Sequence, residues 1–372
     1  MSVPVELPNV SNAPVRAERF YRPELDALRF VAFLGVFLYH ASFLPNQSDL
    51  MWAVSYTGAF GMSLFFVLSS YLITKLLIKE RDLTGKIKLR FFYARRALRI
   101  WPLYFAFLFA VAGIGMYHQP WHVKFGTIAS FSLLSGNWYL ILRGVFGPVM
   151  PLWSLSVEEQ FYAFWPALFS RLDLKWFIRL AIGLIPASLV SVYLLAASGR
   201  FDFAAIWWNT LPQMQFFGIG ALLAIYDYKW STPLQPATRL ALALAGILVW
   251  LGGGICNQAS RAGLNGPLLL ACSYICGIFG CLLLFRAFFG ARRIPSVFLN
   301  SGKISYGLYV FHMAALGVAG NLIRRFLPLS YWMIGQTALA LLLTFLAAHV
   351  SYRFLEKPFL KFKRHFEIIH SR

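Results

Sequence analysis

The first long apolar stretch of the chain carries two polar residues that could do chemistry, Arg29 and His40. They are eleven residues apart, and at about 100° per residue their side chains fall on nearly the same face of a helix. The rise between them is about 16 Å, roughly half the hydrocarbon core of a bilayer. Taken singly, Arg29 could snorkel to the membrane interface and His40 could hydrogen-bond a neighbouring helix. Their shared face, with Asp26 one turn before Arg29, favours a functional site.

A second group of cations directly precedes another apolar stretch. Arg96 and Arg99 are three residues apart, so they face the same way on a helix, and Pro102 follows them. Arginine pairs suit phosphate groups, because the planar guanidinium donates two parallel hydrogen bonds. Anchoring at the cytoplasmic membrane surface explains the excess of charge well. It explains less well why the arginines reach the very start of an apolar span.

Two carboxylates, Glu158 and Glu159, stand near the start of the apolar stretch that follows Pro151. One of them could stabilise the N-terminus of a helix through the helix dipole. The other interpretation is an acid that orients a substrate or pairs with His40. Such a neighbour would raise the basicity of the imidazole and fix its tautomer.

A third polar face lies near the C-terminus, where Ser305, Tyr309 and His312 fall at helical spacing. Hydrogen bonding between helices could account for such a face. Side chains of these types could equally contact a substrate, so both interpretations stay open.

The composition predicts the elements that hold these side chains. Of the 372 residues, 59% are hydrophobic and 17% aromatic, while only 13% are charged. Apolar runs long enough to cross a bilayer recur along the chain. The sequence therefore predicts an all-α polytopic membrane protein. The formal net charge of +20 fits basic loops between spans better than a nucleic-acid-binding surface, so we expect no nucleic-acid partner.

The apolar runs predict ten transmembrane helices. One further stretch, 118–150, is ambiguous, because its apolar part is short and is interrupted by Gly136 and Asn137. We expect it to form a re-entrant or surface segment. The predicted helices cover residues 25–44, 56–78, 100–117, 152–170, 177–197, 204–226, 238–256, 267–288, 303–321 and 331–352.

The basic residues indicate how this arrangement is oriented. With ten spans and both termini in the cytoplasm, 27 of the 34 Lys and Arg residues fall on inner segments and six on outer segments. The positive-inside rule favours that distribution, and one more crossing would move 15 of the 27 outside. The chain then divides into a cytoplasmic N-terminal tail (1–24), a membrane domain (25–352) and a basic cytoplasmic C-terminal tail (353–372).

Several common catalytic motifs are absent from the sequence. There is no G-x-S-x-G elbow, no P-loop, no H-E-x-x-H and no acidic metal cluster. We therefore expect neither covalent serine hydrolysis nor a metal site. The four cysteines fall in apolar segments and are interpreted as packing residues. General acid–base chemistry by histidine remains, together with an arginine-lined anion site.

Taken in their order along the chain, the motifs described above resemble those of the acyltransferase-3 family of integral-membrane O-acyltransferases. The resemblance runs from about residue 20 to 360 and rests on the ordered set rather than on any single motif. The matching pieces are Arg29-x10-His40, Arg96-x-x-Arg99 before Pro102, Trp153-Ser154-Leu155-Ser156-Val157-Glu158-Glu159-Gln160-Phe161-Tyr162, Ser305-x3-Tyr309-x2-His312 and Glu356-x-Pro358.

The resemblance implies transfer of an acyl group, usually acetyl, from cytoplasmic acyl-CoA (acetyl-CoA) to a hydroxyl on the outer side. The implied partners are acyl-CoA, an extracytoplasmic carbohydrate or glycolipid acceptor and membrane lipids. The implied location is the plasma membrane, in bacteria the inner membrane, crossed several times. Some family members carry a further hydrolase-like domain. This sequence ends about 20 residues after the last predicted helix, so we expect the membrane domain to complete the transfer.

The resemblance also suggests where the donor would bind. Arg29, Arg96 and Arg99 would hold the phosphates of acyl-CoA at the inner face. The pantetheine arm of CoA is of the same order as the rise of about 16 Å between Arg29 and His40. The thioester could therefore reach His40 without crossing the whole bilayer.

The remaining residues would act on the acceptor. His40 would be the general base for the acceptor hydroxyl, with Glu158 orienting it or binding the sugar, and a transient acyl-histidine stays open. Ser154, Tyr309 and His312 are the candidate substrate-binding residues. Tyr309 and His312 would line the tunnel or stabilise a developing oxyanion.

A hypothesis from another class uses some of the same residues. A proton-coupled transporter or lipid flippase could pass protons along His40, Glu158 and His312. The missing internal repeat and the arginines clustered at one face count against it. A non-catalytic acyl-CoA sensor is a third and weaker hypothesis.

Overall fold

A computed structural model describes residues 20–41, 49–117, 121–144, 147–230, 232–263, 265–326 and 332–369. These residues form helices joined by connections, and no strand is found among them. A π-helical stretch, Tyr352–Glu356, joins the last two α-helices. The α-helices are α1 (Pro23–Ala41), α2 (Asp49–Thr84), α3 (Leu89–Tyr117), α4 (Phe125–Ser132), α5 (Gly136–Arg143), α6 (Leu152–Arg171), α7 (Leu174–Ala197), α8 (Phe203–Trp208), α9 (Thr210–Tyr226), α10 (Pro236–Arg261), α11 (Gly266–Phe288), α12 (Ser296–Lys303), α13 (Ser305–Phe326), α14 (Trp332–Ser351) and α15 (Lys357–Lys363).

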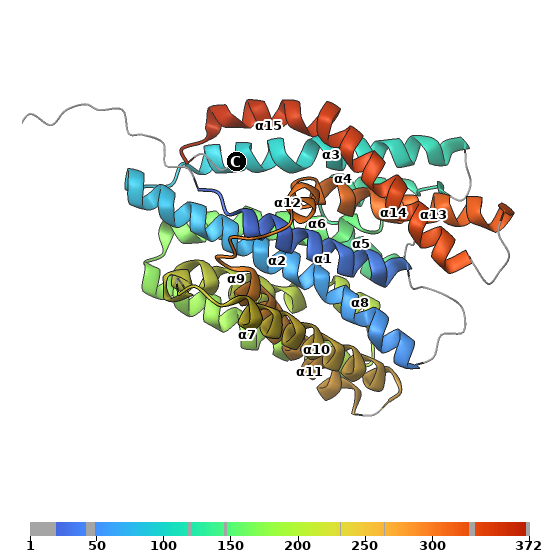
Figure 1. Ribbon diagram of the computed structural model, residues 1–372, viewed down its shortest axis with the longest axis horizontal. Helices are drawn as coiled ribbons and strands as arrows, with labels where there is room; N and C mark the ends of the chain where they lie inside the picture. Colours follow the sequence, from blue (N-terminus) through green and yellow to red (C-terminus); the bar gives the residue numbers. More distant parts are fainter. Residues whose placement is uncertain are drawn as a thin grey trace, which may run out of the picture.

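Helices α1 and α2 run through the middle of the bundle (Figure 1). Helix α2 packs against α1, α9 and α10, and α1 also packs against α12 and α13. In Figure 1, α3, α13, α14 and α15 lie on one side of the α1–α2 pair, and α7, α9, α10 and α11 lie on the other. Residues of α1 are therefore enclosed by other helices on several sides.

Two glycines let α1 and α2 approach each other closely. A Cβ atom added to Gly58 of α2 would lie 2.3 Å from the backbone oxygen of Gly35 in α1. A side chain at that distance would force the helices apart. Such close contacts stabilise helix pairs in a bilayer, where burial of apolar side chains provides little driving force. The contact lies between Arg29 and His40 along α1, so it helps to fix the positions of both residues.

Seven helical runs in the described part of the chain are long and apolar enough to cross a bilayer. Each of the ten predicted spans overlaps at least one helix, but α1, α6 and α9 are not among these seven. Helix α1 carries Glu24, Asp26 and Arg29, and α9 has 17 residues. Ten crossings and two cytoplasmic termini therefore stay predictions. The seven runs are α2, α3, α7, α10, α11, α13 and the run Trp332–Phe366 that begins with α14.

The ambiguous stretch 118–150 contains two short helices where it is described. Helices α4 and α5 have eight residues each. At 1.5 Å per residue such a helix extends about 12 Å, far less than the roughly 30 Å of a bilayer core. This agrees with the expected re-entrant or surface segment.

The predicted span 204–226 is interrupted. Asn209 adopts an extended backbone between α8 and α9, and its side-chain oxygen accepts a 3.0 Å hydrogen bond from the Leu211 N–H. Asparagine is a favoured N-cap because this bond satisfies a donor that has no partner within the helix. The apolar run concealed this cap, so hydropathy alone predicted one helix where the structure has two.

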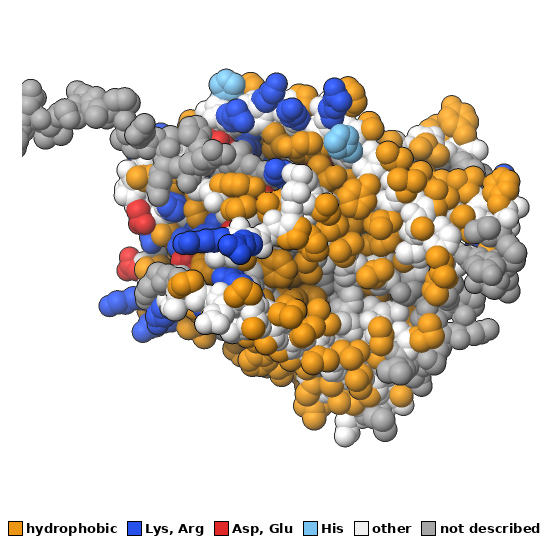
Figure 2. Space-filling view, in the orientation of Figure 1, with side chains coloured by type: hydrophobic (Ala, Val, Ile, Leu, Met, Phe, Trp, Pro, Cys, Tyr) orange, Lys and Arg blue, Asp and Glu red, His pale blue; other side chains and the backbone are white. Residues whose placement is uncertain are grey.

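Charged side chains gather at one end of the bundle (Figure 2). Much of the remaining visible surface is hydrophobic, as expected for a surface that faces lipid. The connection between α2 and α3 and the C-terminal helix α15 lie toward this end (Figure 1). We call it the basic end. From the positive-inside rule we expect it to face the cytoplasm, and this orientation stays a prediction.

Candidate functional site

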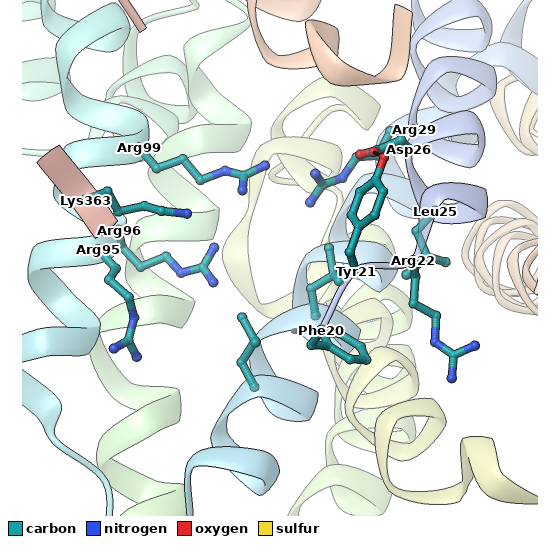
Figure 3. Close-up of a pocket in the computed structure, with 12 residues that line it drawn as sticks. Phe20, Tyr21, Arg22, Leu25, Asp26, Arg29, Arg95, Arg96, Arg99 and Lys363 are labelled. Atoms are coloured by element: carbon teal, nitrogen blue, oxygen red, sulfur yellow. Dashed lines mark hydrogen bonds between the residues drawn. The ribbon is translucent and has the colours of Figure 1, made fainter. Parts of the chain in front are cut away.

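The arginines predicted to bind an anion line one cavity, here called the arginine cavity. Arg29 of α1, Arg96 and Arg99 of α3 and Lys363 of α15 all line it. Figure 3 shows the guanidinium groups of Arg29 and Arg99 pointing toward each other from opposite walls. Asp26 is the one carboxylate among its described lining residues. The cavity therefore has an excess of positive charge.

Two other enclosed cations, Lys75 and Arg95, are paired with carboxylates. Lys75 Nζ lies 2.5 Å from Asp227 Oδ1, and Arg95 Nη2 lies 2.9 Å from Glu80 Oε2. The side chains of Asp227 and Glu80 are only 4% and 2% exposed, so each pair neutralises a charge that has little access to water. In both pairs a carboxylate of the chain itself neutralises the cation.

Arg95 and Arg22, which is paired with Glu24, also line the arginine cavity, but the three predicted arginines differ from them. Within the described part of the chain, none of Arg29, Arg96 and Arg99 makes an ion pair, and Arg96 Nε is buried without a hydrogen-bond partner. The Arg96 guanidinium lies instead 5.6 Å from the ring centres of Phe92 and Tyr162. A buried charge without a partner costs several kcal/mol. The arrangement is therefore suited to binding an anion from outside the chain.

A second basic cavity borders the first through Arg99 and Lys363, which line both. We call it the lysine cavity. Glu356 is the one carboxylate among its described lining residues. The further cations of the lysine cavity are Lys303, Lys357, Lys361 and Arg364.

A third cavity, the central cavity, shares its three arginines with the arginine cavity. Glu158 lines it and accepts a 2.8 Å hydrogen bond from the Tyr162 hydroxyl. The sequence suggested that Glu158 pairs with His40 near the outer face. The structure places it beside the arginines instead, because it stands almost two helical turns beyond the first residue of α6.

Two predicted substrate residues meet at the wall of the central cavity. Ser154 Oγ and Tyr309 Oη are 2.7 Å apart, and Tyr309 Oη lies 2.9 Å from the carbonyl oxygen of Pro151. These bonds join the start of α6 to the second turn of α13. Tyr309 and Met62 line both this cavity and the next one, so they form the boundary between the two.

His40 lines the fourth cavity, here called the aromatic cavity. Helix α1 begins at the arginine cavity and His40 stands in its last turn, so this cavity lies farther from the basic end. Arg261 is the one Lys or Arg among its described lining residues. The walls are otherwise dominated by aromatic side chains, namely Tyr39, Trp52, Tyr56, Trp153, Phe203, Trp207, Trp208 and Tyr309.

His40 of α1 contacts His312 of α13 directly. Their ring centres are 4.9 Å apart, and His40 Nδ1 lies 3.1 Å from His312 Nε2. His312 is fully buried. Helical spacing predicted each histidine as a candidate but could not show that α13 faces α1 at this point. Glu158, the third member of the predicted proton relay, has its described hydrogen bond with Tyr162.

Sequence reasoning missed two parts of this arrangement. The lysine cavity was represented only by a basic C-terminal tail, whose charges were attributed to the positive-inside rule. The aromatic cavity draws its walls from α1, α2, α6, α8, α10 and α13, and no local motif marks it. No group of three or more His, Cys, Asp and Glu residues is placed to hold a metal ion in the part of the chain that the structure describes.

The fold and the site define a multi-pass α-helical membrane protein with an internal cavity lined by arginines. The sequence assigns it more narrowly: the family model described as an acyltransferase domain matches residues 22–353. The chain therefore belongs to the acyltransferase-3 family, as its motifs predicted. No solved structure matches it significantly.

Relatives of the chain carry names that specify O-acetyl transfer. It is 31% identical to a Staphylococcus aureus (strain MSSA476) protein named "Putative O-acetyltransferase", over 92% of this chain and 58% of that protein. It is 29% identical to the peptidoglycan O-acetyltransferase OatA of Listeria monocytogenes, over 93% of this chain and 57% of the relative. The chain is 27% identical to the O-acetyltransferase OatA of Staphylococcus aureus (strain NCTC 8325 / PS 47), over 92% of this chain and 57% of that protein. The chain thus spans somewhat less than three fifths of these relatives.

The contrast between paired and unpaired arginines predicts opposite effects on stability. Arg95→Met leaves the buried carboxylate of Glu80 without its cation and should destabilise the protein by about 3–5 kcal/mol. Arg96→Met replaces a side chain of the same size whose charge makes no ion pair with a described carboxylate. It should leave the stability of the protein unchanged or raise it. Thermal unfolding of the purified, ligand-free variants in detergent measures both. A loss of stability for Arg96→Met as large as that for Arg95→Met would show that Arg96 is a structural cation.

Proposed function

We propose that this chain transfers an acetyl group from cytoplasmic acetyl-CoA to a hydroxyl of an extracytoplasmic carbohydrate or glycolipid. The observation that carries the proposal is the order of the cavities along the bundle. Unpaired arginines lie toward the basic end, a histidine pair lies farther along, and adjoining cavities connect the two regions. The names of the relatives support acetyl as the group transferred.

The donor would bind at the basic end with its phosphates among the cations. A CoA molecule carries a diphosphate and a separate 3′-phosphate, so it needs two neighbouring anion sites. The arginine cavity suits the diphosphate, because Arg29, Arg96 and Arg99 reach it from two helices. The lysine cavity suits the 3′-phosphate. The pantetheine arm would then extend through the central cavity toward Tyr309.

The acceptor would enter the aromatic cavity. Sugar rings have apolar faces that pack against indole and phenol rings, and an aromatic wall excludes water from the reacting groups. Peptidoglycan is the acceptor named for the Listeria relative, and a glycan of that class suits such walls. The acetylated hydroxyl would lie against His40, where the aromatic cavity meets the central cavity.

The reaction then needs one base and no covalent intermediate. His40 takes the proton of the acceptor hydroxyl while the oxygen attacks the thioester carbonyl. The tetrahedral adduct collapses as the C–S bond breaks, and the CoA thiolate recovers the proton from the imidazolium. The hydroxyls of Ser154 and Tyr309 are 2.7 Å apart at the boundary between the two cavities and are the candidate donors to the developing oxyanion.

Binding of a CoA analogue tests the division of the donor site. Removing the 3′-phosphate should weaken wild-type binding about tenfold or more, because charge-assisted hydrogen bonds contribute about 1.5–3 kcal/mol. The double variant Lys357→Gln/Lys361→Gln should bind acetyl-CoA and 3′-dephospho-acetyl-CoA equally. Calorimetry on the purified protein measures these affinities.

The matched control for this experiment is Arg292→Gln/Arg293→Gln. It removes two exposed cations that line none of the four cavities. The control should discriminate between the two ligands as wild type does. If wild type itself binds both ligands equally, the lysine cavity does not hold the 3′-phosphate. If all variants discriminate equally, another site does.

Replacement of His40 tests the chemical step. His40→Ala should abolish acetylation of the acceptor but leave acetyl-CoA binding intact, because Arg29 lies about 16 Å away along α1 and His40 does not line the arginine cavity. Mass spectrometry of cell-envelope glycans measures acetylation, and donor binding shows that the variant is folded. Envelope acetylation at the wild-type level in His40→Ala would remove His40 from the mechanism.

A further inference from the structure

The two ring nitrogens of His312 face different atoms. Nδ1 faces the carbonyl oxygen of Tyr309, while Nε2 lies 3.1 Å from Nδ1 of His40. A carbonyl oxygen only accepts hydrogen bonds, so Nδ1 of His312 carries a hydrogen. A neutral imidazole carries one N–H, and full burial favours the neutral form. Nε2 of His312 therefore presents a lone pair to His40.

The same reasoning applied to His40 gives a consistent answer. Its Nδ1 lies 3.0 Å from the carbonyl oxygen of Val36 and 3.1 Å from Nε2 of His312. Both neighbours are acceptors, so Nδ1 of His40 must be the donor. The Tyr309 carbonyl sets the tautomer of His312, and the Nε2 lone pair of His312 then shares the Nδ1 hydrogen of His40 with the Val36 carbonyl. In the neutral state Nε2 of His40 is then the basic nitrogen.

We infer that His312 is a positioning residue for the proposed transfer reaction. Through its Nε2 lone pair it acts together with the Val36 carbonyl to fix the tautomer of His40, and it aims the basic Nε2 nitrogen of His40 at the acceptor hydroxyl. The inference rests on the proposed function, because it concerns the same base. It gives His312 a different role from that of lining the tunnel or contacting the substrate.

The surroundings of His312 are suited to this task. Its ring packs edge-on against Phe33 of α1, with ring centres 6.5 Å apart and planes at 85°. The hydrogen bond from Nδ1 to the Tyr309 carbonyl, one turn earlier in the same helix, also holds the ring. An orienting group must itself be held in place, since small displacements of a base reduce catalysis strongly. Packing and hydrogen bonding both restrict this imidazole.

The proton transfers of this step balance without any further reactant. The acceptor proton moves to His40 Nε2 as the new C–O bond forms, and the imidazolium charge strengthens its Nδ1–H bond to His312. When the thioester C–S bond breaks, the thiolate takes the proton from Nε2. His312 keeps its own Nδ1 hydrogen throughout, so it never exchanges a proton with the substrate.

Two substitutions of similar length separate hydrogen bonding from packing. The amide of His312→Gln can place an acceptor oxygen near the position of Nε2, whereas His312→Met fills the space without a comparable acceptor. His312→Met should lower kcat about 100-fold, with KM for acetyl-CoA unchanged, as losses of orienting partners do elsewhere. His312→Gln should recover at least about tenfold of that loss. Steady-state kinetics of the purified protein with a peptidoglycan-derived oligosaccharide measures both.

Nitrogen NMR of the protein labelled with ¹⁵N-histidine provides a second readout. In wild type, His40 should show a protonated Nδ1 and an unprotonated Nε2. In His312→Met, His40 Nδ1 keeps the Val36 carbonyl but loses the His312 acceptor, so the share of the Nε2–H tautomer should rise, whereas a purely structural role would leave the tautomer unchanged. His40→Ala in the same spectra identifies the His40 signals.

The contradicting outcomes can be told apart. Equal kcat values for His312→Gln and His312→Met, or a wild-type tautomer in His312→Met, would overturn the positioning role. If His40→Ala retains full activity, the proposed function of His40 fails instead, whatever the His312 variants do. Unchanged acetyl-CoA binding shows that the His312 variants are folded.

Discussion

The arrangement of this protein depends on positive charge that the chain does not neutralise. A cation inside a membrane bundle is costly, and the fold compensates Lys75 with Asp227 and Arg95 with Glu80. Arg29, Arg96 and Arg99 lack such partners among the described residues, although they share one cavity. This cost is understandable if an anionic ligand supplies the missing charge. The cavities beyond the arginines would then form a route from the bound anion to the histidines.

Close helix packing positions the two ends of this route. The contact of Gly35 with Gly58 holds α1 against α2, and α13 packs on another side of α1. Helix α1 can therefore present Arg29 to one cavity and His40 to another, about 16 Å farther along. The hydroxyls of Ser154 and Tyr309 stand between these regions. One central helix thus links a region suited to phosphates with a region suited to a sugar.

The sequence predicted this site where local spacing carries the information. The shared face of Arg29 and His40 needs only the helical repeat, and both side chains line internal cavities. Spacing within one helix could not predict contacts between helices. The bond between His40 and His312 joins residues 272 positions apart. For the same reason Glu158 was expected beside His40, whereas it lies among the arginines.

Hydropathy predicted the helices well and their boundaries less well. It located a helix at each of the ten expected ranges, because apolar runs of bilayer length have few alternatives to helix. It could not detect the cap at Asn209 that divides α8 from α9. It also gave no sign of the aromatic cavity, whose walls come from helices far apart in sequence. Such a surface exists only once the bundle is assembled.

The central claim is that an acetyl group enters from the basic end and leaves on an acceptor at the other end. Sealed membrane vesicles of both orientations, from cells that express the chain, test it directly with externally added radiolabelled acetyl-CoA. Everted vesicles, which expose the cytoplasmic face, should accumulate alkali-labile acetyl label on envelope glycans inside, and right-side-out vesicles should not. Equal labelling in both orientations, or labelling only of right-side-out vesicles, would contradict the account.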